Sequence, residues 1–363
     1  MEFYGGLIVV RRIMIWISSY RRLRSSCRLS YLIGLSILQY GGNAFCSSLM
    51  ENQKVPSGPI PIVNQAPIQL LFLQAMPDRA EIVPKGHGSL RLNTTITNTL
   101  LSQQDADYEG VIDIEMIRSS LDLCYGIAPG FEIGMSLPFV YSYGGIMDHA
   151  ILDVEQFFDS VRKVREEQEP DRYEYAVKKN EKAFISGKEK RCTGVGDLVL
   201  RIKGKIWDEG DRAPGLSARL AVKLPTGDTD RALGSGKVDY GLGLLLQKNI
   251  DRLTLYLNAD VIFPGDAFDQ DNVPLSEFYD IMLGGEYRIK PRLSLLMQVN
   301  YVTRPFKDTG LEMLDKRILD LLLGVNYCTK HGILIQGGAV EDFFDSEDAG
   351  ADITFFLNIG MYF

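Results

Sequence analysis

The last eleven residues of the chain, ITFFLNIGMYF, alternate between two kinds of side chain. One set is Ile353, Phe355, Leu357, Ile359, Met361 and Phe363, and the other includes Thr354, Asn358, Gly360 and Tyr362. Because successive side chains of a β-strand point to opposite faces, this alternation predicts a strand with one apolar face. Whether that face contacts a protein core or lipid decides what the chain folds into.

The same period of two recurs along the chain. It is clearest in GLSARLAVKLP, DRLTLYLNADVIF, PRLSLLMQVNY and LDLLLGVNY, whose opposite faces repeatedly carry polar or charged side chains. After the amino-terminal region the chain holds no run of 18 apolar residues, so spanning helices are not predicted. Strands can still cross a membrane, because their hydropathy signal is much weaker.

The links between these segments alternate in length. Short links lie at 128–130, 209–214, 249–251, 290–291 and 329–332, and longer polar loops lie near 102–110, 144–193, 227–236, 264–277, 305–315 and 341–350. Short periplasmic turns on one rim and long extracellular loops on the other are typical of outer-membrane β-barrels. The pattern therefore predicts an all-β fold, an antiparallel transmembrane β-barrel of about twelve strands (roughly 12–14).

The predicted barrel occupies residues 88–363 as one domain. Its strands are expected at about 88–101, 111–126, 130–143, 194–207, 214–226, 237–249, 252–264, 277–289, 292–304, 316–328, 331–342 and 351–363. An even number of strands brings both ends of the barrel to the rim of short turns. Most of these segments exceed the roughly 9 to 11 residues that a tilted strand needs to cross the hydrocarbon.

Two amino-terminal regions stand apart from this pattern. Residues 1–44 contain a basic stretch, the apolar run LSYLIGLSILQYGG and a small-residue site, which together predict a secretory signal peptide cleaved after Ala44 or Cys46. Residues 45–87 are rich in proline and are predicted to form a periplasmic or lumen-entering segment, with Ile68 to Gln74 as a candidate for an additional strand. Prolines at 56, 59, 61 and 67 argue against a regular central strand there.

Charge and cysteine usage exclude several classes of function. The formal net charge of −8 becomes −13 without residues 1–44, which hold six Arg and one acid, so nucleic acid is not a predicted partner. Cys46, Cys124, Cys192 and Cys328 are scattered without the spacing of a metal site or a disulfide framework. The sequence predicts no cofactor and no metal site.

The stretch VGDLVLRIKGKIW, followed by LSARLAVKLPTGDTDRALGSGKVDYGLGLLL, resembles an uncharacterised domain-of-unknown-function family (3187) of Gram-negative outer-membrane β-barrel proteins. GPIPIVNQAPI and YGGIMDHAILDVEQFF fit the same family, so the resemblance spans most of the chain after the leader. More distantly the chain is similar to the transporter-like barrels of aromatic meta-cleavage pathways. The resemblance implies export, an outer-membrane location and a closed barrel, but no reaction or substrate.

If the apolar faces contact lipid, charged side chains on the opposite faces project into the lumen. They are Arg91, Arg118, Asp122, Glu132, Arg201, Lys203, Lys205, Arg219, Lys223, Asp239, Asp260, Glu286, Arg288 and Asp320. Two hypotheses compete for them. The charges either pair with one another and make a narrow barrel rigid, or an unpaired remainder attracts anionic solutes through a charge-lined pore.

The long loop at 144–193 contains ILDVEQFFDSVRKV, whose apolar residues have helical spacing. Its Phe157 and Phe158 are candidates for a constriction of the pore. The only histidines are His87, His149 and His331, and no serine and carboxylate can be placed beside any of them, so the chain is not predicted to be an enzyme.

These observations predict an outer-membrane β-barrel in a Gram-negative cell, exported through its signal peptide, that acts as a channel or transporter for small molecules. The alternative is a structural or surface-interaction barrel whose lumen is closed by internal salt bridges. The predicted partners are outer-membrane lipids, a small-molecule solute of unknown identity, and the barrel-assembly machinery, which would recognise Ile359, Met361 and Phe363 at the carboxyl terminus.

Overall fold

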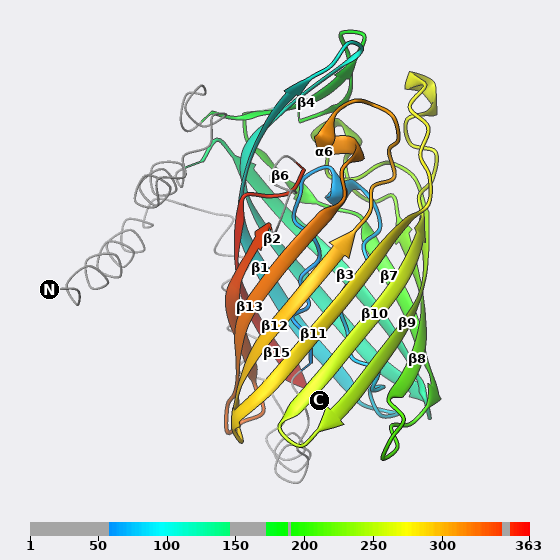
Figure 1. Ribbon diagram of the computed structural model, residues 1–363, viewed down its shortest axis with the longest axis vertical. Coiled ribbons are helices and arrows are strands. Elements are labelled where there is room, and N and C mark those ends of the chain that lie inside the picture. Colours follow the sequence, from blue (N-terminus) through cyan, green and yellow to red (C-terminus); the bar gives the residue numbers. More distant parts are fainter. Residues whose placement is uncertain (1–57, 146–171, 188–189, 343–348) are drawn as a thin grey trace, which may run out of the picture. The chain divides into compact units, whose positions relative to one another are not determined.

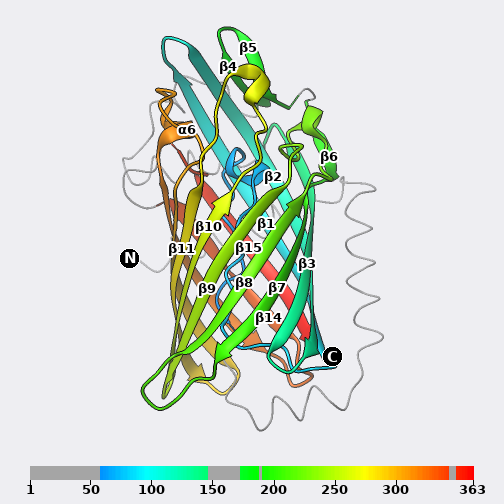
Figure 2. The same ribbon diagram turned by 90° about the vertical axis from the view of Figure 1, so that its right-hand side faces the viewer.

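Twelve antiparallel strands close into a barrel in the computed structural model, which describes residues 58–145, 172–187, 190–342 and 349–363 (Figures 1 and 2). The barrel strands are β1 (Gly88–Gln104), β2 (Tyr108–Ala128), β3 (Phe131–Tyr143), β7 (Leu198–Trp207), β8 (Gly215–Leu224), β9 (Asp239–Ile250), β10 (Leu253–Phe263), β11 (Phe278–Lys290), β12 (Leu293–Val302), β13 (Ile318–Cys328), β14 (Leu334–Asp342) and β15 (Ile353–Tyr362). Each strand pairs with the next in this order, and β15 pairs with β1 to close the ring. The predicted all-β barrel is confirmed.

One predicted strand, 194–207, is divided in the structure. Its first part is β6 (Cys192–Val195), which pairs with the end of β3, and its second part is β7. The break lies opposite Pro138 of β3, which has no N–H to donate to a neighbouring strand. Asp197, at the break, instead accepts a hydrogen bond from Gly227 N at 2.8 Å.

The remaining elements lie at the rim of long loops. A hairpin of β4 (Glu174–Lys179) and β5 (Lys182–Ser186) extends the sheet beyond the barrel by pairing with β2. The helical pieces are the 3₁₀ turns η2 (Gln69–Leu71), η3 (Thr229–Arg231) and η4 (Asp269–Asp271) and the single-turn helix α6 (Glu312–Asp315). Among the described residues, no helix is long and apolar enough to span a membrane. Residues 1–57, including the predicted signal peptide, and the loop residues Phe157 and Phe158 lie outside the described part of the chain.

The outer surface of the barrel is apolar because side chains alternate between the two faces of each strand, and the apolar side chains face outward. Leu283 of β11 and Met297 of β12 are each 59% exposed, and Leu357 of β15 is 51% exposed. Their strand neighbours point inward: Met282 is 1% exposed and Asn358 is 1% exposed. A soluble protein rarely exposes so many large apolar side chains in a continuous band.

Aromatic side chains edge this apolar band at both rims. Tyr240 and Tyr279 are exposed near the long loops, and Trp207, Tyr287 and Tyr327 are exposed near the short turns. Tyr279 and Tyr287 stand at opposite ends of β11, eight positions apart, which corresponds to about 27 Å along a strand. Such aromatic girdles mark the two lipid–water interfaces of membrane β-barrels.

The two rims differ as the link lengths predict. The rim of short links, here called the turn rim, includes Gly130, Asp251 and Gly332, which adopt positive φ angles of 79°, 51° and 74° in tight turns. The opposite rim, the loop rim, holds a packed apolar cluster. In that cluster Phe72 contacts Phe268 and Phe306 at ring-centroid distances of 6.4 and 5.7 Å. This packing orders the loops over that end of the barrel.

Candidate functional site

Residues 58–87, here called the lumen segment, run inside the barrel (blue in Figures 1 and 2). The segment starts near the turn rim, where Gly58 N donates to Glu286 Oε2 at 3.3 Å. It then ascends along β12, where Ile60 N donates to Gln298 Oε1 at 2.9 Å and Gln298 Nε2 donates to Ile60 O at 3.2 Å. The segment thus climbs from one rim toward the other.

The lumen segment turns at the loop rim and descends again. At the turn, Arg304 donates to Gln69 Oε1 at 3.3 Å. On the way down Leu73 N donates to Asp239 Oδ2 at 2.8 Å, and Val83 N donates to Glu132 Oε2 at 2.6 Å near the turn rim. The chain then enters β1 at Gly88, so the lumen holds an up-and-down hairpin of extended chain.

The wall binds this segment through its side chains because the segment cannot build a sheet with itself. Its prolines lack N–H groups, and its other backbone groups are buried away from water and need partners. Inward amide and hydroxyl side chains supply them. Asn258 both accepts from Asp78 N at 2.8 Å and donates to Asp78 O at 2.9 Å, and Ser217 donates to Ala80 O at 2.5 Å. Inward-facing amides such as Asn258 are visible in the sequence as polar residues within apolar strands, and they are the signal from which these contacts could have been predicted.

The prediction of an additional strand at Ile68 to Gln74 is wrong. Residues Gln69–Leu71 form the 3₁₀ turn η2 at the top of the lumen segment, where Leu70 N donates to Ala66 O at 3.1 Å. The chain reverses direction here, which an extended strand cannot do. Its apolar side chains Ile68, Leu71 and Phe72 are buried in the loop-rim cluster instead of pairing in the sheet.

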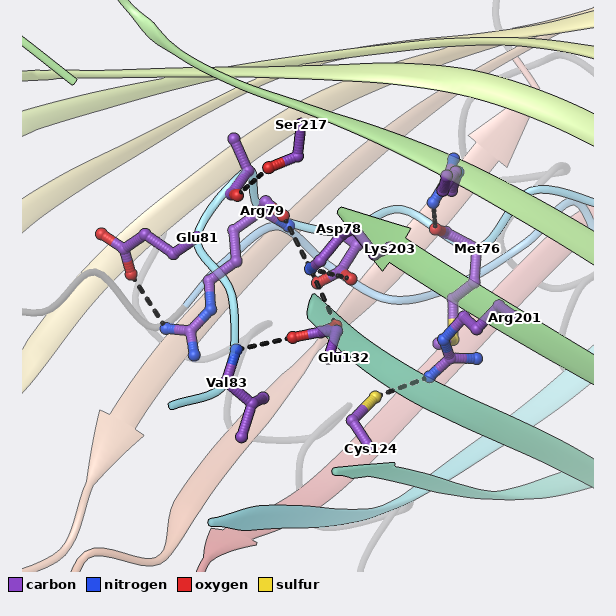
Figure 3. Close-up of polar contacts among 12 residues, drawn as sticks. Met76, Asp78, Arg79, Glu81, Val83, Cys124, Glu132, Arg201, Lys203 and Ser217 are labelled. Atoms are coloured by element: carbon purple, nitrogen blue, oxygen red, sulfur yellow. Dashed lines mark hydrogen bonds and ion pairs between the residues drawn. The ribbon is translucent and has the colours of Figure 1, made fainter. Parts of the chain in front are cut away.

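Lys203 of β7 links the lumen segment to the wall (Figure 3). Its Nζ lies 2.7 Å from Asp78 Oδ2 and 3.1 Å from Glu132 Oε1, and it donates to Arg79 O at 3.0 Å. The Lys203 side chain is only 3% exposed. Because Lys203 is buried, losing either acid would leave its charge unbalanced. The contacts of its ammonium group with Asp78 and Arg79 therefore fix the position of the descending arm against β7.

Lys223 of β8 forms a second link near the loop rim. Its Nζ lies 2.7 Å from Asp197 Oδ2 and 3.2 Å from Asp239 Oδ2. It also donates to Leu71 O and to Ser235 Oγ, at 2.8 and 2.7 Å. One buried ammonium therefore joins two barrel strands, the loop after β8 and the lumen segment.

Arg219 of β8 and Asp260 of β10 form a two-pronged ion pair across the intervening strand β9. Arg219 Nε donates to Asp260 Oδ1 at 2.7 Å and its NH2 to Oδ2 at 2.6 Å, and its NH1 donates to Met76 O. The residue of β9 between them is Gly243, which pairs with both in the ladder. Because Gly243 has no side chain, the guanidinium and the carboxylate meet over it.

Gly243→Ala is expected to lower the free energy of unfolding by about 2 kcal/mol. A β-carbon at position 243 would lie 1.8 Å from Asp260 Oδ1, so the carboxylate must leave Arg219. The measurement is thermal unfolding of the detergent-solubilised barrel. Gly285→Ala is the matched control, because its β-carbon would meet only Leu255 and Leu253 side-chain atoms at 3.8 and 3.9 Å. Equal stability of the two variants would contradict the role of Gly243.

The other charged residues predicted to line the lumen occupy different places. Asp320 and Glu286 are buried against the lumen segment, and Asp320 Oδ2 accepts from Asn64 at 2.8 Å. Arg201 NH2 donates to Cys124 Sγ at 3.1 Å (Figure 3). Lys205 and Arg288 lie at the turn rim, where Lys205 contacts Asp208 at 2.7 Å and Arg288 donates to Asp251 O at 2.9 Å. A place for any of these residues on a conduction route stays a prediction.

The candidate assembly signal lies on the outward face of β15. Ile359 is exposed, Met361 is half-buried and Phe363 is exposed. Recognition of these three residues by an assembly machine stays a prediction.

A cavity of about 90 Å³, here called the lumen cavity, lies between the lumen segment and the wall of β1, β2, β3, β7 and β8. Its lining is mixed: apolar side chains such as Val63, Met76 and Val140 stand beside polar ones such as Asn93, Ser120 and Ser136. Tyr175 of β4 lines its upper end, where burial raises the pKa of the phenol, so the hydroxyl stays protonated. The cavity is a part of the barrel interior that the lumen segment does not fill.

Residues 42–363 match the model of a protein family described as "Protein of unknown function (DUF3187)". The chain belongs to this family. The DUF3187 resemblance expected from the sequence is therefore confirmed. A comparison of this DUF3187 chain with curated proteins finds no match.

Among solved structures, this DUF3187 protein is similar to the COG4313 outer membrane channel from Pseudomonas putida F1. The TM-score is 0.54 at 15% sequence identity, and the likeness covers 80% of this chain and 100% of the other. A weaker likeness is to the KdgM porin, with a TM-score of 0.41 at 8% identity, covering 76% and 99% of the two chains. The first likeness supports the outer-membrane barrel fold.

Proposed function

We propose that this protein is an outer-membrane channel or transporter that passes small molecules between the lumen segment and the barrel wall. The observation that carries the proposal is a closed barrel with an apolar, aromatic-edged outer band and a polar interior that keeps an unfilled cavity. A barrel in lipid needs the first two properties, but the cavity is not needed for stability. The similar solved COG4313 barrel is described as an outer membrane channel, which agrees with the proposal.

The lumen segment makes this a restricted channel. Its hydrogen bonds to Asn258, Gln298 and Asp320 hold it against the wall of β10 to β13, whereas the cavity lies along β1 to β3, β7 and β8. In this proposal, solutes pass along the part of the wall formed by β1 to β3, β7 and β8. The outward surface also supports a location in a membrane, because an apolar band between two aromatic girdles is stable only in a bilayer.

A second candidate function is a structural or surface-interaction barrel. The observation that favours it is the internal pairing: Lys203, Arg219 and Lys223 each bind a buried carboxylate and also the backbone of the lumen segment. If the segment never moves, the same contacts close the barrel permanently.

Flux through the intact protein separates the two candidates. Liposomes that contain the purified protein are expected to take up a small neutral solute such as glycerol several-fold faster than protein-free liposomes. A large sugar polymer serves as the size control, because it is expected to stay outside. Uptake no faster than in protein-free liposomes would reject the channel and support the structural barrel.

A further inference from the structure

We propose that a basic surface at the turn rim, here called the turn-rim patch, binds the phosphate groups of anionic phospholipids in the adjacent membrane leaflet. The patch lies on three neighbouring turns, which join β9 to β10, β11 to β12 and β13 to β14. Its cations are Arg252, Arg288, Lys290, Arg292 and Lys330. The inference concerns the outer rim of the barrel, so it holds whether or not solutes pass through the lumen.

Hydrogen bonds between the turns join these cations into one ordered surface. Arg288 N donates to Arg252 O at 2.9 Å, and the Arg288 side chain donates to Asp251 O, also at 2.9 Å. At the next turn, Cys328 N donates to Arg292 O at 3.0 Å. Because backbone groups of one turn bind the next turn, the three turns keep fixed positions relative to one another.

Cations outnumber acids in the turn-rim patch. Asp251 is the one acid on these three turns, against five cations. Lys290, Arg292 and Lys330 are exposed, and within the described ranges none of their side chains pairs with an acid. The whole chain has 47 acids and 39 Lys and Arg residues, so its composition alone would not produce a surface of this sign.

The acids at the two ends of the patch do not cancel its charge. Glu209, on the turn between β7 and β8, lies 3.2 Å from Lys248 and also accepts from Asn249. The terminal carboxylate of Phe363 follows β15, beyond the last of the three turns in strand order. Even if both are counted against the patch, its cations remain in excess.

The turn-rim patch stands at the depth of the lipid headgroups. Tyr287 of β11 is 49% exposed and belongs to the aromatic girdle at this rim, and Lys290 follows it by three positions. Three residues of a strand tilted by about 40° advance about 8 Å toward the rim. The headgroup layer on each side of a bilayer is about 5–8 Å thick. The ammonium group of Lys290 is therefore within reach of phosphate groups.

A β-bulge turns Lys290 toward the lipid. The register of β11 and β12 shifts here, so that Arg288 pairs with Ser294 and Lys290 pairs with Leu293. Ser294 is buried on the inward face, and by the alternation of β12 its neighbour Leu293 belongs to the outward face. Without the additional residue, Lys290 would share the inward face with Arg288. Bulges commonly redirect a side chain in this way.

The chemistry of an anionic phospholipid fits this surface. Lys and Arg form charge-assisted hydrogen bonds with phosphate oxygens. Each basic residue held near an anionic lipid surface adds to the attraction. Phosphatidylglycerol carries a net negative charge, whereas the phosphate of phosphatidylcholine is neutralised by its own choline group. The patch is therefore expected to distinguish these two lipids.

Lipid retention by the full-length protein tests the inference. The protein is placed in nanodiscs of equal parts phosphatidylglycerol and phosphatidylcholine, and the lipids that stay bound after detergent extraction are counted by native mass spectrometry. We expect at least about three-fold more phosphatidylglycerol than phosphatidylcholine to stay bound. The triple variant Lys290→Gln, Arg292→Gln and Lys330→Gln is expected to bind the two lipids equally. Lys290→Gln alone is expected to lose about half of the preference, which keeps the test possible if the triple variant does not fold.

The matched control removes three exposed lysines from the loop rim, by Lys182→Gln, Lys237→Gln and Lys307→Gln. It makes the same change of charge away from the patch, so the lipid preference is expected to remain. Three results would overturn the inference: equal retention of both lipids by the intact protein, an unchanged preference in the triple variant, or an equal loss in the control.

A competition experiment separates lipid from free phosphate. Inorganic phosphate at about 10 mM is expected to leave the bound phosphatidylglycerol in place, because several headgroups held in one leaflet contact the patch together. Displacement of the lipid by phosphate ions at this concentration would show that the patch binds free phosphate, and would reject the lipid as its ligand.

Discussion

Removal of residues 58–83 is expected to raise the single-channel conductance of the barrel in planar bilayers by about ten-fold or more. A barrel of about eight strands is filled by its own side chains, whereas barrels of 16 to 18 strands enclose a water-filled channel. Twelve strands leave a lumen of intermediate width, and in this protein the lumen segment occupies most of it. Without the segment, water and ions replace it along the polar wall.

A variant with the chain intact keeps this prediction testable if the deletion prevents folding. Replacing Gln298 and Asn258 together by Leu removes the amide that binds the ascending arm at Ile60 and the amide that binds the descending arm at Asp78. We expect this double variant to open more often than the parent protein. Met297→Leu changes the outward-facing neighbour of Gln298 and is expected to leave the openings unchanged. A folded deletion variant with the conductance of the parent would show that the segment is not the obstruction.

Lys223→Met is expected to lower the free energy of unfolding by about 3–5 kcal/mol, because it removes the cation from a buried cluster. Asp197 and Asp239 would then face each other without their shared partner, and Leu71 O would lose its donor. Thermal unfolding in detergent measures the loss.

The matched control for this variant is Lys182→Met. Lys182 also contacts an acid, Asp271, at 2.6 Å, but its side chain is 72% exposed at the loop rim. Exposed pairs of this kind contribute about 0.2–1 kcal/mol, so the control is expected to lose no more than that. A similar small loss for Lys223→Met would mean that the cluster relaxes without its cation, and would contradict its role as a link between wall and segment.

These contacts bear on the two hypotheses for the basic residues of β7 and β8. From the sequence, Arg201, Lys203, Lys205, Arg219 and Lys223 fit either an internal network of ion pairs or a selective pore. In the structure Lys203, Arg219 and Lys223 each bind buried acids and the lumen segment.

The sequence by itself determined the barrel. Apolar and polar side chains alternate in most strands from β7 to β15 because lipid and lumen lie on opposite faces of one wall, and this pattern is local. Short links at 249–251 and 290–291 likewise identified the turn rim, since a tight turn depends on a few adjacent residues. Strand boundaries could therefore be predicted within a few residues.

Only the tertiary structure decided what fills the barrel. Ile60 binds Gln298, which is 238 positions away in the sequence. The proline-rich lumen segment has no periodic pattern of side chains from which its path could be predicted. The partner of each buried charge was equally hidden, because it depends on which strands the barrel brings together across the lumen. Local patterns reveal which face a residue occupies, but the contacts that set function here join residues from distant parts of the chain.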